Sequence, residues 1–335
     1  MGGRTSAVRV GVDVGGTKTL CVVVDESGTI IARVREPTLP WERSVSATVI
    51  LAVNKTLDMA WSRFGRRERD DGPGEPKLVS VGIGIPGMVD HRTGKVHQAV
   101  NLGSGVGDIG DAVRDAFHVP VTVDNDVNAA AMGVYRYCCP GSRELVFLNL
   151  GTGVAAGIVL QGRLFRGMSG VAGEIGHVPL DPTGALCRCG QRGCAETMVS
   201  GHALSRIWPV SKGYPGEDLL LRARDGEVRA VEVWHGFGLN VARLIEMITA
   251  TFDPADIFIG GGVSSIGDPL MRVIRHGISR LESESSFVRS LDMCDRIHLA
   301  DQDIPVGALG AAFLSEEPVA LRASHEIRPS YKQGE

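Results

Sequence analysis

The stretch VRVGVDVGGTKTLCVVVD, residues 8–25, decides the fold, because it places a glycine turn between two apolar runs that are typical of buried strands. IIARVRE, residues 30–36, follows a short turn and predicts a third strand. A helix is expected over residues 44–64, and then a charged loop broken by glycine and proline. LVSVGIGIPG, residues 78–87, predicts another buried strand, and a long loop is expected from there through Asn101.

The second half of the chain repeats this order. ELVFLNL, residues 144–150, predicts a strand, GTG a glycine turn, and VAAGIVL, residues 154–160, a second strand. After an insertion, helices alternate with the predicted strands DIFIGGG, residues 256–262, and RIHLAD, residues 296–301. Hairpins followed by helix–strand alternation predict two mixed sheets flanked by helices, with a ligand cleft between them.

Composition is that of a globular protein of about two domains. The 335 residues are 43% hydrophobic and 22% charged, and the formal net charge of -4 gives no basic field for nucleic acid. The opening residues lack the apolar segment of a signal peptide, and the longest apolar run is too short to span a bilayer. We therefore expect a soluble cytoplasmic protein with no nucleic-acid or membrane partner.

The glycine turn DVGGTKT, residues 13–19, differs from two common phosphate-binding motifs. Thr17 precedes Lys18 and a strand follows, whereas a Walker loop has glycine, lysine and serine or threonine leading into a helix. A dinucleotide fingerprint also needs that helix. Taken alone, the segment is equally consistent with an anion-binding turn and with a plain hairpin turn.

Two further glycine loops favour the phosphate-binding interpretation. LGTG, residues 150–153, has the matching place in the second half, and IGGGVSS, residues 259–265, follows a predicted strand and precedes a helix. Three such loops around one cleft predict a nucleotide site. Asp13 precedes the first loop, where a carboxylate can hold Mg²⁺ through water.

The segment VDNDVN, residues 123–128, crowds four polar residues at the end of a predicted strand and the start of a helix. One of them is enough to cap the helix, since Asn and Asp are favoured at this position. Because the run holds more than a cap needs, we interpret Asp126 as a general base in the cleft.

The cysteines indicate metal chemistry. Cys187, Cys189 and Cys194 lie in CRCGQRGCAE, and with His177 of GEIGH they form a Cys₃His set suited to tetrahedral zinc. Four protein ligands leave no open position, so the zinc would be structural. Glu174 and Glu196 flank the knuckle and are free to bind hydroxyls. The adjacent pair 138–139 is interpreted as an ordinary helix end rather than a redox pair.

These segments closely resemble the ROK family of sugar kinases and regulators, within the actin-like ATPase superfamily. The match runs from DVGGTKT through GIGIPG, VDND, LGTG, GEIGH and CRCGQRGCAE to IGGGVS. It implies an α/β fold of two actin-like (ribonuclease H-like) domains with an interdomain cleft. It also implies a homodimer and the phosphorylation of a hexose or amino-hexose at its 6-hydroxyl with ATP and Mg²⁺.

The resemblance further implies a role for each matching residue. Asp126 is the expected base, the sugar ligands are Gly87, Asn101, Asn125, Asp126, Glu174, His177 and Glu196, the nucleotide-loop residues are Gly15, Gly16, Thr17, Lys18, Thr152, Gly153, Gly261 and Gly262, and the zinc ligands are His177, Cys187, Cys189 and Cys194. We expect one domain to comprise residues 1–127 plus 306–335, and the other residues 128–305.

Two departures bear on the substrate. Glucokinase-like members usually have Trp shortly after the Asn-Leu pair that is residues 101–102 here, and members often have Glu near Val134, but this chain has neither. The first change lies near the sugar loop and keeps amino-sugar and N-acetylhexosamine kinases as alternatives. A non-catalytic sugar-responsive regulator is the alternative of another class, although the predicted first strand by Arg9 leaves no room for an N-terminal helix-turn-helix.

Overall fold

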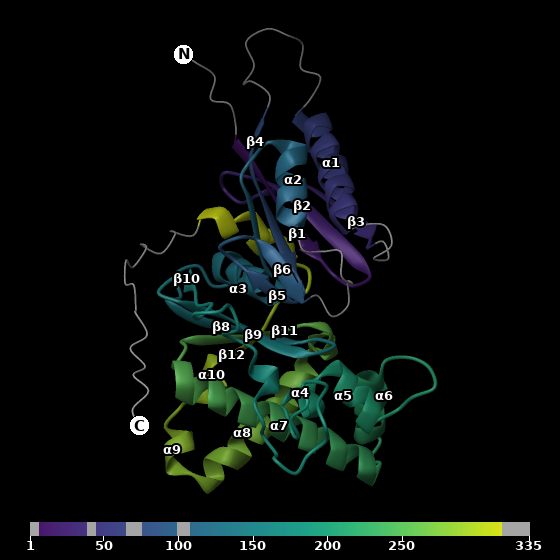
Figure 1. Cartoon of the computed structure of the whole chain (residues 1–335). Helices are drawn as coiled ribbons and strands as arrows, with labels where there is room; N and C mark the ends of the chain where they lie inside the picture. Colours follow the sequence, from purple (N-terminus) through teal and green to yellow (C-terminus); the bar gives the residue numbers. More distant parts are fainter. Residues whose placement is uncertain (1–6, 39–44, 65–75, 99–107, 317–335) are drawn as a thin grey trace, which may run out of the picture.

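The computed structural model describes residues 7–38, 45–64, 76–98 and 108–316. Among these residues, no helix has the length and apolar character needed to cross a membrane. The described strands form two five-stranded sheets and one two-stranded sheet, and helices lie between the two large sheets and on their outer faces (Figure 1).

The two sheets have the same topology, so the predicted duplication is confirmed. In each, the first three strands are antiparallel neighbours, and the fourth and fifth run parallel to the first, beyond it. The N-terminal sheet has the order β3 (Ile30–Pro37), β2 (Lys18–Asp25), β1 (Ala7–Val14), β4 (Lys77–Ile85), β7 (Val121–Asn125). The C-terminal sheet has the order β10 (Arg163–Leu164), β9 (Val154–Leu160), β8 (Glu144–Leu150), β11 (Asp256–Gly260), β12 (Ile297–Leu299).

The described helices vary from short turns to the 25-residue α7. The α-helices are α1 (Val45–Phe64), α2 (Ile109–Phe117), α3 (Asp126–Tyr137), α4 (Glu196–Val199), α5 (Gly201–Ile207), α6 (Pro215–Arg224), α7 (Val228–Phe252), α8 (Asp268–Glu284), α9 (Ser286–Arg289), α10 (Met293–Arg296) and α11 (Val306–Ala312), and the 3₁₀ helices are η2 (Ile175–His177), η3 (Gly262–Ile266) and η4 (Leu314–Glu316).

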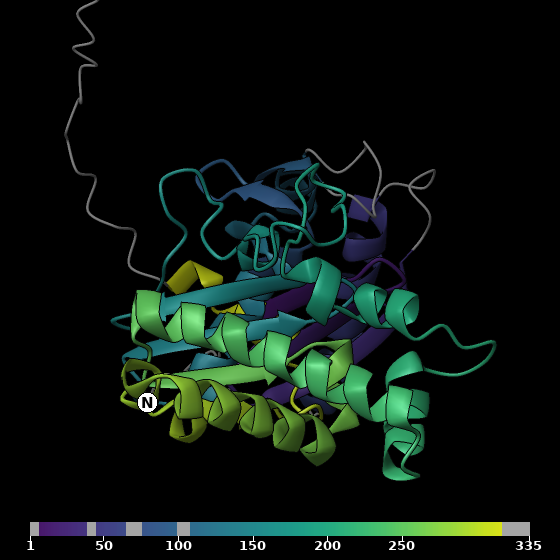
Figure 2. The same ribbon diagram turned by 90° about the horizontal axis from the view of Figure 1, so that it is seen from below.

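Successive residues of each strand point to opposite faces of the sheet, and each face is covered by different helices. In β8, Val146 and Leu148 belong to the core that contains α7 and α8, whereas Leu145 and Phe147 pack with α3. The N-terminal sheet follows the same rule, with alternate residues of β1 and β2 packed under α1 and α2 and the intervening residues of β2 packed on α11. Figure 2 shows α7 and α8 lying along the outer face of the C-terminal sheet.

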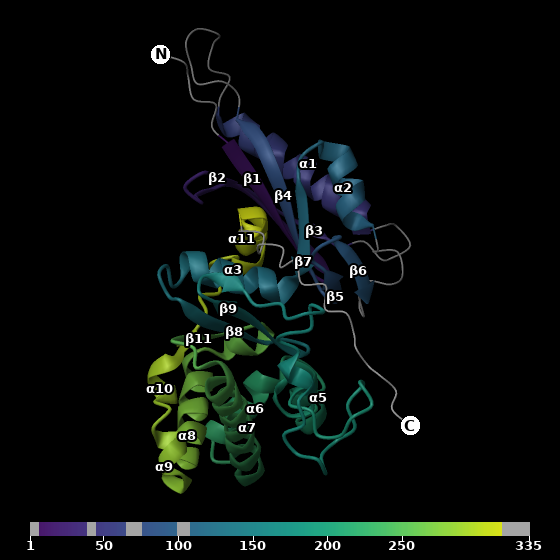
Figure 3. The same cartoon turned by 60° about the vertical axis from the view of Figure 1, so that its left-hand side comes forward.

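Helices α3 and α11 lie between the two sheets and pack against each other (Figure 3). Helix α11 contacts β1, β2 and β4, and α3 contacts β8 and β9 as well as β4. The approach is at backbone distance, because a Cβ on Gly11 of β1 or Gly82 of β4 would overlap carbonyl oxygens of α11, and one on Gly133 of α3 would overlap that of Val306. Glycine is therefore required where these strands and helices meet.

The long loop expected after β4 is a partly wrong prediction. Residues 88–98 instead contain a two-stranded antiparallel sheet of β5 (Met88–Asp90) and β6 (Lys95–Gln98). The hairpin strands have only three and four residues, too few for a periodic pattern, and their buried residues are Val89 and Val96 alone. The rest of the expected loop, including Asn101, lies outside the described residues.

We predict that Gly82→Ala destabilises the protein. The new Cβ would overlap the carbonyl oxygen of Ala311, which is backbone and so cannot rotate away. Overpacking of this kind costs about 1–3 kcal/mol in free energy of unfolding, measurable by urea denaturation. Gly236→Ala is the matched control, since no atom lies within 4 Å of its added Cβ inside α7, and it should raise stability by up to about 1 kcal/mol. Equal midpoints for the two variants would contradict backbone contact between β4 and α11.

Candidate active site and metal site

The acidic segment predicted to carry the catalytic base lies where β7 ends and α3 begins. Asn125 caps α3: its Oδ1 accepts hydrogen bonds from the backbone N–H groups of Val127 (2.8 Å) and Asn128 (3.3 Å). Its Nδ2 donates to the carbonyl oxygen of Gly87 at 3.1 Å. Both ends of this amide are thus bonded within the protein, and the capping role falls to Asn125 rather than to Asp126.

Asp124 is buried and supports the same junction. Its Oδ1 accepts from the Asn125 N–H at 2.7 Å and from the Asn128 Nδ2 at 2.9 Å, and its Oδ2 accepts from Arg166 Nε at 2.7 Å. A second guanidinium nitrogen of Arg166 lies 2.6 Å from that oxygen. Sequence reasoning missed this pair, because nothing in the sequence links an arginine of the insertion to a strand end 42 residues earlier.

Asp126 and Asp13 are carboxyl groups with raised pKa values. Burial, and to a lesser extent the negative charge of Glu174, raise the pKa of Asp126 to about 6, against the lowering effect of the hydrogen bond from the Val127 N–H. Burial, and then the charge of Asp126, raise the pKa of Asp13 to about 7. The charge of Asp126 acts on Asp13, and that of Glu174 acts on Asp126, so the three carboxyl groups are neighbours in a region largely shielded from water.

Glu174, His177 and Glu196 gather next to the second glycine turn. Glu196, at the start of α4, accepts a hydrogen bond from the Val154 N–H at 3.1 Å, and a Cβ on Gly153 would lie 2.5 Å from its Oε2. Burial raises the pKa of Glu174, the charge of His177 lowers it, and that of Glu196 raises it. The three predicted sugar-face residues are therefore electrostatic neighbours.

A cavity of about 730 Å³ opens between the two sheets. Its walls include Asp13, Gly261 and Ser264, together with Gly307 at the start of α11. Gly261 has φ +84°, and an added Cβ there would lie 2.5 Å from Asn149 Oδ1, so this turn requires glycine. The volume lies in the ordinary range for a site that holds a small molecule.

The structure brings together only part of the predicted nucleotide set. Asp13 and Gly261 line the cavity, but Gly15, Gly16, Thr17, Lys18, Thr152, Gly153 and Gly262 are not among the residues that line it. The first hairpin turn is closed by a hydrogen bond from the Gly15 N–H to the Lys18 carbonyl oxygen at 2.9 Å, and the second by one from Gly151 to Gly153 at 3.0 Å. Two arginines, Arg33 and Arg35 of β3, line the cavity without having been predicted.

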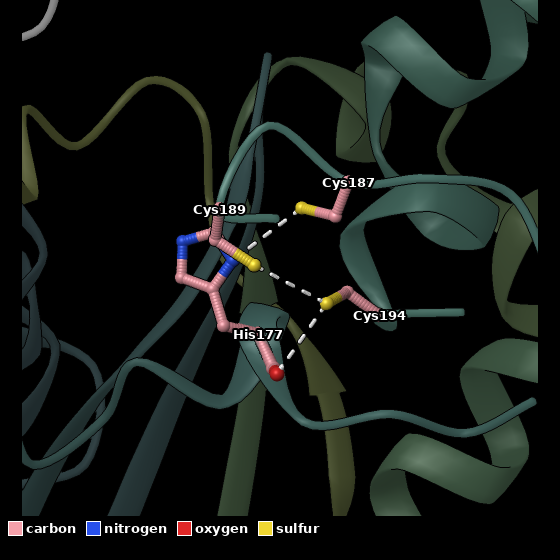
Figure 4. Close-up of side chains that lie close together, drawn as sticks. All are labelled: His177, Cys187, Cys189 and Cys194. Atoms are coloured by element: carbon pink, nitrogen blue, oxygen red, sulfur yellow. Dashed lines mark hydrogen bonds between the residues drawn. The ribbon is translucent and has the colours of Figure 1, made fainter. Parts of the chain in front are cut away.

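The three cysteines and His177 converge as the sequence predicts (Figure 4). His177 Nδ1 lies 3.7 Å from Cys187 Sγ, Cys189 Sγ lies 3.6 Å from Cys194 Sγ, and all four ligand atoms lie within 4.8 Å of one another. Ligands of a tetrahedral zinc ion with Zn–S bonds of about 2.3 Å are about 3.8 Å apart. The donor set and its spacing therefore fit zinc.

The local backbone holds the zinc-binding loop in place. Cys194 and Pro179 form a β-bridge, and the Cys187 N–H donates to the Gln191 carbonyl oxygen at 2.7 Å. Because Nδ1 of His177 faces the sulfur atoms, Nε2 points away from them (Figure 4). The ring thus offers one nitrogen to a metal and leaves the other free for a ligand.

The adjacent Cys138 and Cys139 end α3 away from this loop. Burial raises the pKa of both thiols, and the Cys139 thiol donates to Asp256 Oδ2 at 3.2 Å. A raised thiol pKa disfavours a reactive thiolate, in agreement with the interpretation as a helix end.

Comparison with known proteins matches residues 9–317 to the model of the ROK family. The chain belongs to the ROK family. It is 31% identical to a glucokinase of Streptomyces coelicolor, over 92% of this chain and 98% of that protein. It is 29% identical to the crystal structure of a ROK family glucokinase from Streptomyces griseus in complex with glucose and AMPPNP, with 92% and 98% of the two chains covered and a TM-score of 0.71.

The relatives of this chain also include transcriptional repressors. A xylose repressor of Caldicellulosiruptor bescii is 29% identical over 62% of this chain and 56% of the repressor. The two-sheet fold is that of the actin-like ROK sugar kinases, and the glucokinase relatives support a sugar kinase.

We predict that the purified protein contains about one zinc ion per chain and that a chelator lowers its thermal stability, because metal binding in such sites contributes to folding. Cys189→Ser should lose most of the zinc, as measured by inductively coupled plasma mass spectrometry. Cys294→Ser is the control, since this half-buried cysteine is not part of the cluster and should leave the zinc content unchanged. Zinc retained in full by Cys189→Ser would contradict the assignment.

Proposed function

We propose that this protein transfers the γ-phosphoryl group of ATP to the 6-hydroxyl of a hexose. The observation that supports the proposal is the raised pKa of the buried Asp126 carboxyl. Its neighbour Asn125 caps the helix, and the pKa of the Asp126 carboxyl is raised to about 6 by burial, which supports its assignment as the base in the cleft. A carboxylate in this position suits general-base catalysis near neutral pH.

In the proposed reaction, Asp126 accepts the proton of the sugar hydroxyl as the oxygen attacks the γ-phosphorus in line. With a pKa of about 6, the carboxyl is mostly ionised at pH 7 and still basic enough to take the proton. Burial excludes water, which both strengthens the interaction with the hydroxyl and limits wasteful hydrolysis of ATP.

The remaining sugar hydroxyls are assigned to Glu174, Glu196 and His177. Carboxylates accept hydrogen bonds from hydroxyls, and the Nε2 of His177 is directed away from the cysteines. The ring of His177 would have its tautomer and orientation fixed by zinc bound at Nδ1. Asn125 and Gly87 are bonded to each other, so we assign them to shaping the pocket floor as much as to direct contact with the sugar.

The donor is assigned to the cavity lined by Asp13 and Gly261. The hairpin turns at Gly15–Lys18 and Thr152–Gly153, which do not line this cavity, are assigned to the phosphates of the donor. Their backbone N–H groups suit phosphate oxygens. Asp13 is the residue that would hold Mg²⁺ through water, and the ion would offset negative charge on the phosphates. The raised pKa of Asp13 supports this, since a cation relieves its repulsion from Asp126.

We also propose the domain division 1–127 plus 306–335 and 128–305. Supporting contacts are those of α11 with β1, β2 and β4, which return the end of the chain to the first sheet, and those of α3 with β8 and β9. Closure of two such domains about α3 and α11 would bring Asp126 and the donor phosphate together. A homodimer, expected from the family resemblance, can be checked by analytical ultracentrifugation.

Replacing Asp126 with Asn should lower kcat by roughly 10²–10⁴-fold, because the amide keeps the shape of the carboxyl but cannot accept the proton. The same change should alter the pH profile. For the native protein, kcat/KM should fall as the pH drops through about 6, since protonation removes the base. That limb should be absent from the residual activity of Asp126→Asn. A variant with near-native turnover, or with the same acid limb, would show that another group is the base.

The substrate is tested with a panel of Mg-ATP and glucose, glucosamine, 3-amino-3-deoxyglucose, N-acetylglucosamine and N-acetylmannosamine, compared by kcat/KM. We expect glucose to be phosphorylated, with an amino or N-acyl hexose as the competitor, because two carboxylates also suit an ammonium group. 6-Deoxyglucose should bind and not react. If none of the five consumes ATP while a sugar binds, the protein is a sugar-responsive regulator instead.

A further inference from the structure

Arg33 and Arg35 lie on the edge strand of the N-terminal sheet and face the donor cavity. In the strand register, Asp13 is opposite Leu20, and Leu20 is opposite Arg35, so the three residues form one row across β1, β2 and β3. Arg33 is opposite Val22 in the next row on the same face. With neighbouring strands about 5 Å apart, the Cα atoms of Asp13 and Arg35 are separated by roughly 10 Å.

Much of the rest of that sheet face is apolar. Val22 and Val24 pack against Ala308 and Leu309 of α11, and the two arginines continue the face beyond the helix. Charged residues are common on edge strands, where they prevent strand pairing with other chains. That explanation suffices for Glu36 on the opposite face, which forms an ion pair with Lys55 of α1 at 2.8 Å.

It does not explain two cations lining one cavity. Within the described parts of the chain, no carboxylate lies within 4.0 Å of either guanidinium group, although Asp301 and Asp303 stand on the walls of the same cavity. Asp13, Asp301 and Asp303 would repel a phosphate chain unless cations offset their charge. The cavity therefore combines three acids, suited to a cation, with two unpaired guanidinium groups, suited to an anion.

We infer that Arg33 and Arg35 bind the phosphate groups of the phosphoryl donor. Guanidinium groups pair with phosphate oxygens through two parallel hydrogen bonds, which an ammonium cannot reproduce. The inference rests on the proposed function in that a phosphoryl donor occupies this cavity. A nucleoside triphosphate and inorganic polyphosphate share the phosphate chemistry, so the experiment must separate these two sources.

The test is isothermal titration calorimetry on the double variant Arg33→Gln/Arg35→Gln, with ATP, adenosine and inorganic tripolyphosphate in the presence of Mg²⁺. Loss of a charge-assisted hydrogen bond weakens binding by roughly 10- to 100-fold. We expect losses of this size for ATP and tripolyphosphate, and none for adenosine. The double lysine variant, which keeps the charges, should recover part of the affinity and report on correct folding.

The matched control is Arg163→Gln. Arg163 is an exposed arginine on β10, the corresponding edge strand of the second sheet, and it does not line the cavity. It should bind all three ligands as the native protein does. A loss for tripolyphosphate alone would still support phosphate binding and would identify inorganic polyphosphate as the donor.

The inference is overturned if the double variant binds ATP and tripolyphosphate within twofold of the native protein, or if adenosine loses as much affinity as ATP. Failure of the proposed function looks different. In that case the native protein would bind ATP with the same dependence on the two arginines, and yet would phosphorylate no hexose of the panel.

Discussion

The backbone contact between β1, β4 and α11 is the constraint on which the rest of the structure depends. A glycine on each strand lets the helix lie against the sheet without intervening side chains, and the glycine of α3 at residue 133 does the same between the two helices. Because α3 and α11 pack at backbone distance, the two sheets lie close together, and the ends of β1, β7 and β9 lie near one another. A side chain in this layer would move Asp13 away from Asp126 and weaken the like-charge repulsion that, after burial, raises the pKa of Asp13.

Burial and repulsion among these carboxyl groups are unfavourable for folding but useful for phosphoryl transfer. Carboxyl groups with raised pKa values destabilise the ionised protein, since burial and like charges both disfavour their charged forms. The free energy of such carboxyl groups falls when a cation, a hydroxyl proton or a sugar enters the cleft. The acids therefore provide binding energy that is released only when the ligands are present, which is the property that distinguishes a site from an ordinary ion-paired surface.

Short stretches of sequence correctly predicted the elements whose residues are all close together in the chain. The duplicated strand–turn–strand units, the helix over residues 45–64 and the cysteine cluster are all written in short segments, and the structure confirms them. The β5–β6 hairpin was missed because its strands are too short to have a period. The pair of Asp124 with Arg166, and the row from Asp13 to Arg35, depend on register and on contacts between distant segments, which no single window of sequence contains.

The zinc-binding loop extends the same logic from folding to ligand binding. In GEIGH, Gly173 and Gly176 lie against the backbone of β9, next to Glu174 and His177, and the bridge of Pro179 with Cys194 joins the cysteine segment to this region. A metal bound by that loop would fix Nδ1 of His177 and leave Nε2 directed away from the sulfur atoms. Glu196 follows two residues after Cys194 and reaches the second glycine turn. One short segment thus joins the metal site, the carboxylates and a predicted phosphate turn, so a change in any of the three is transmitted to the others through a few covalent bonds.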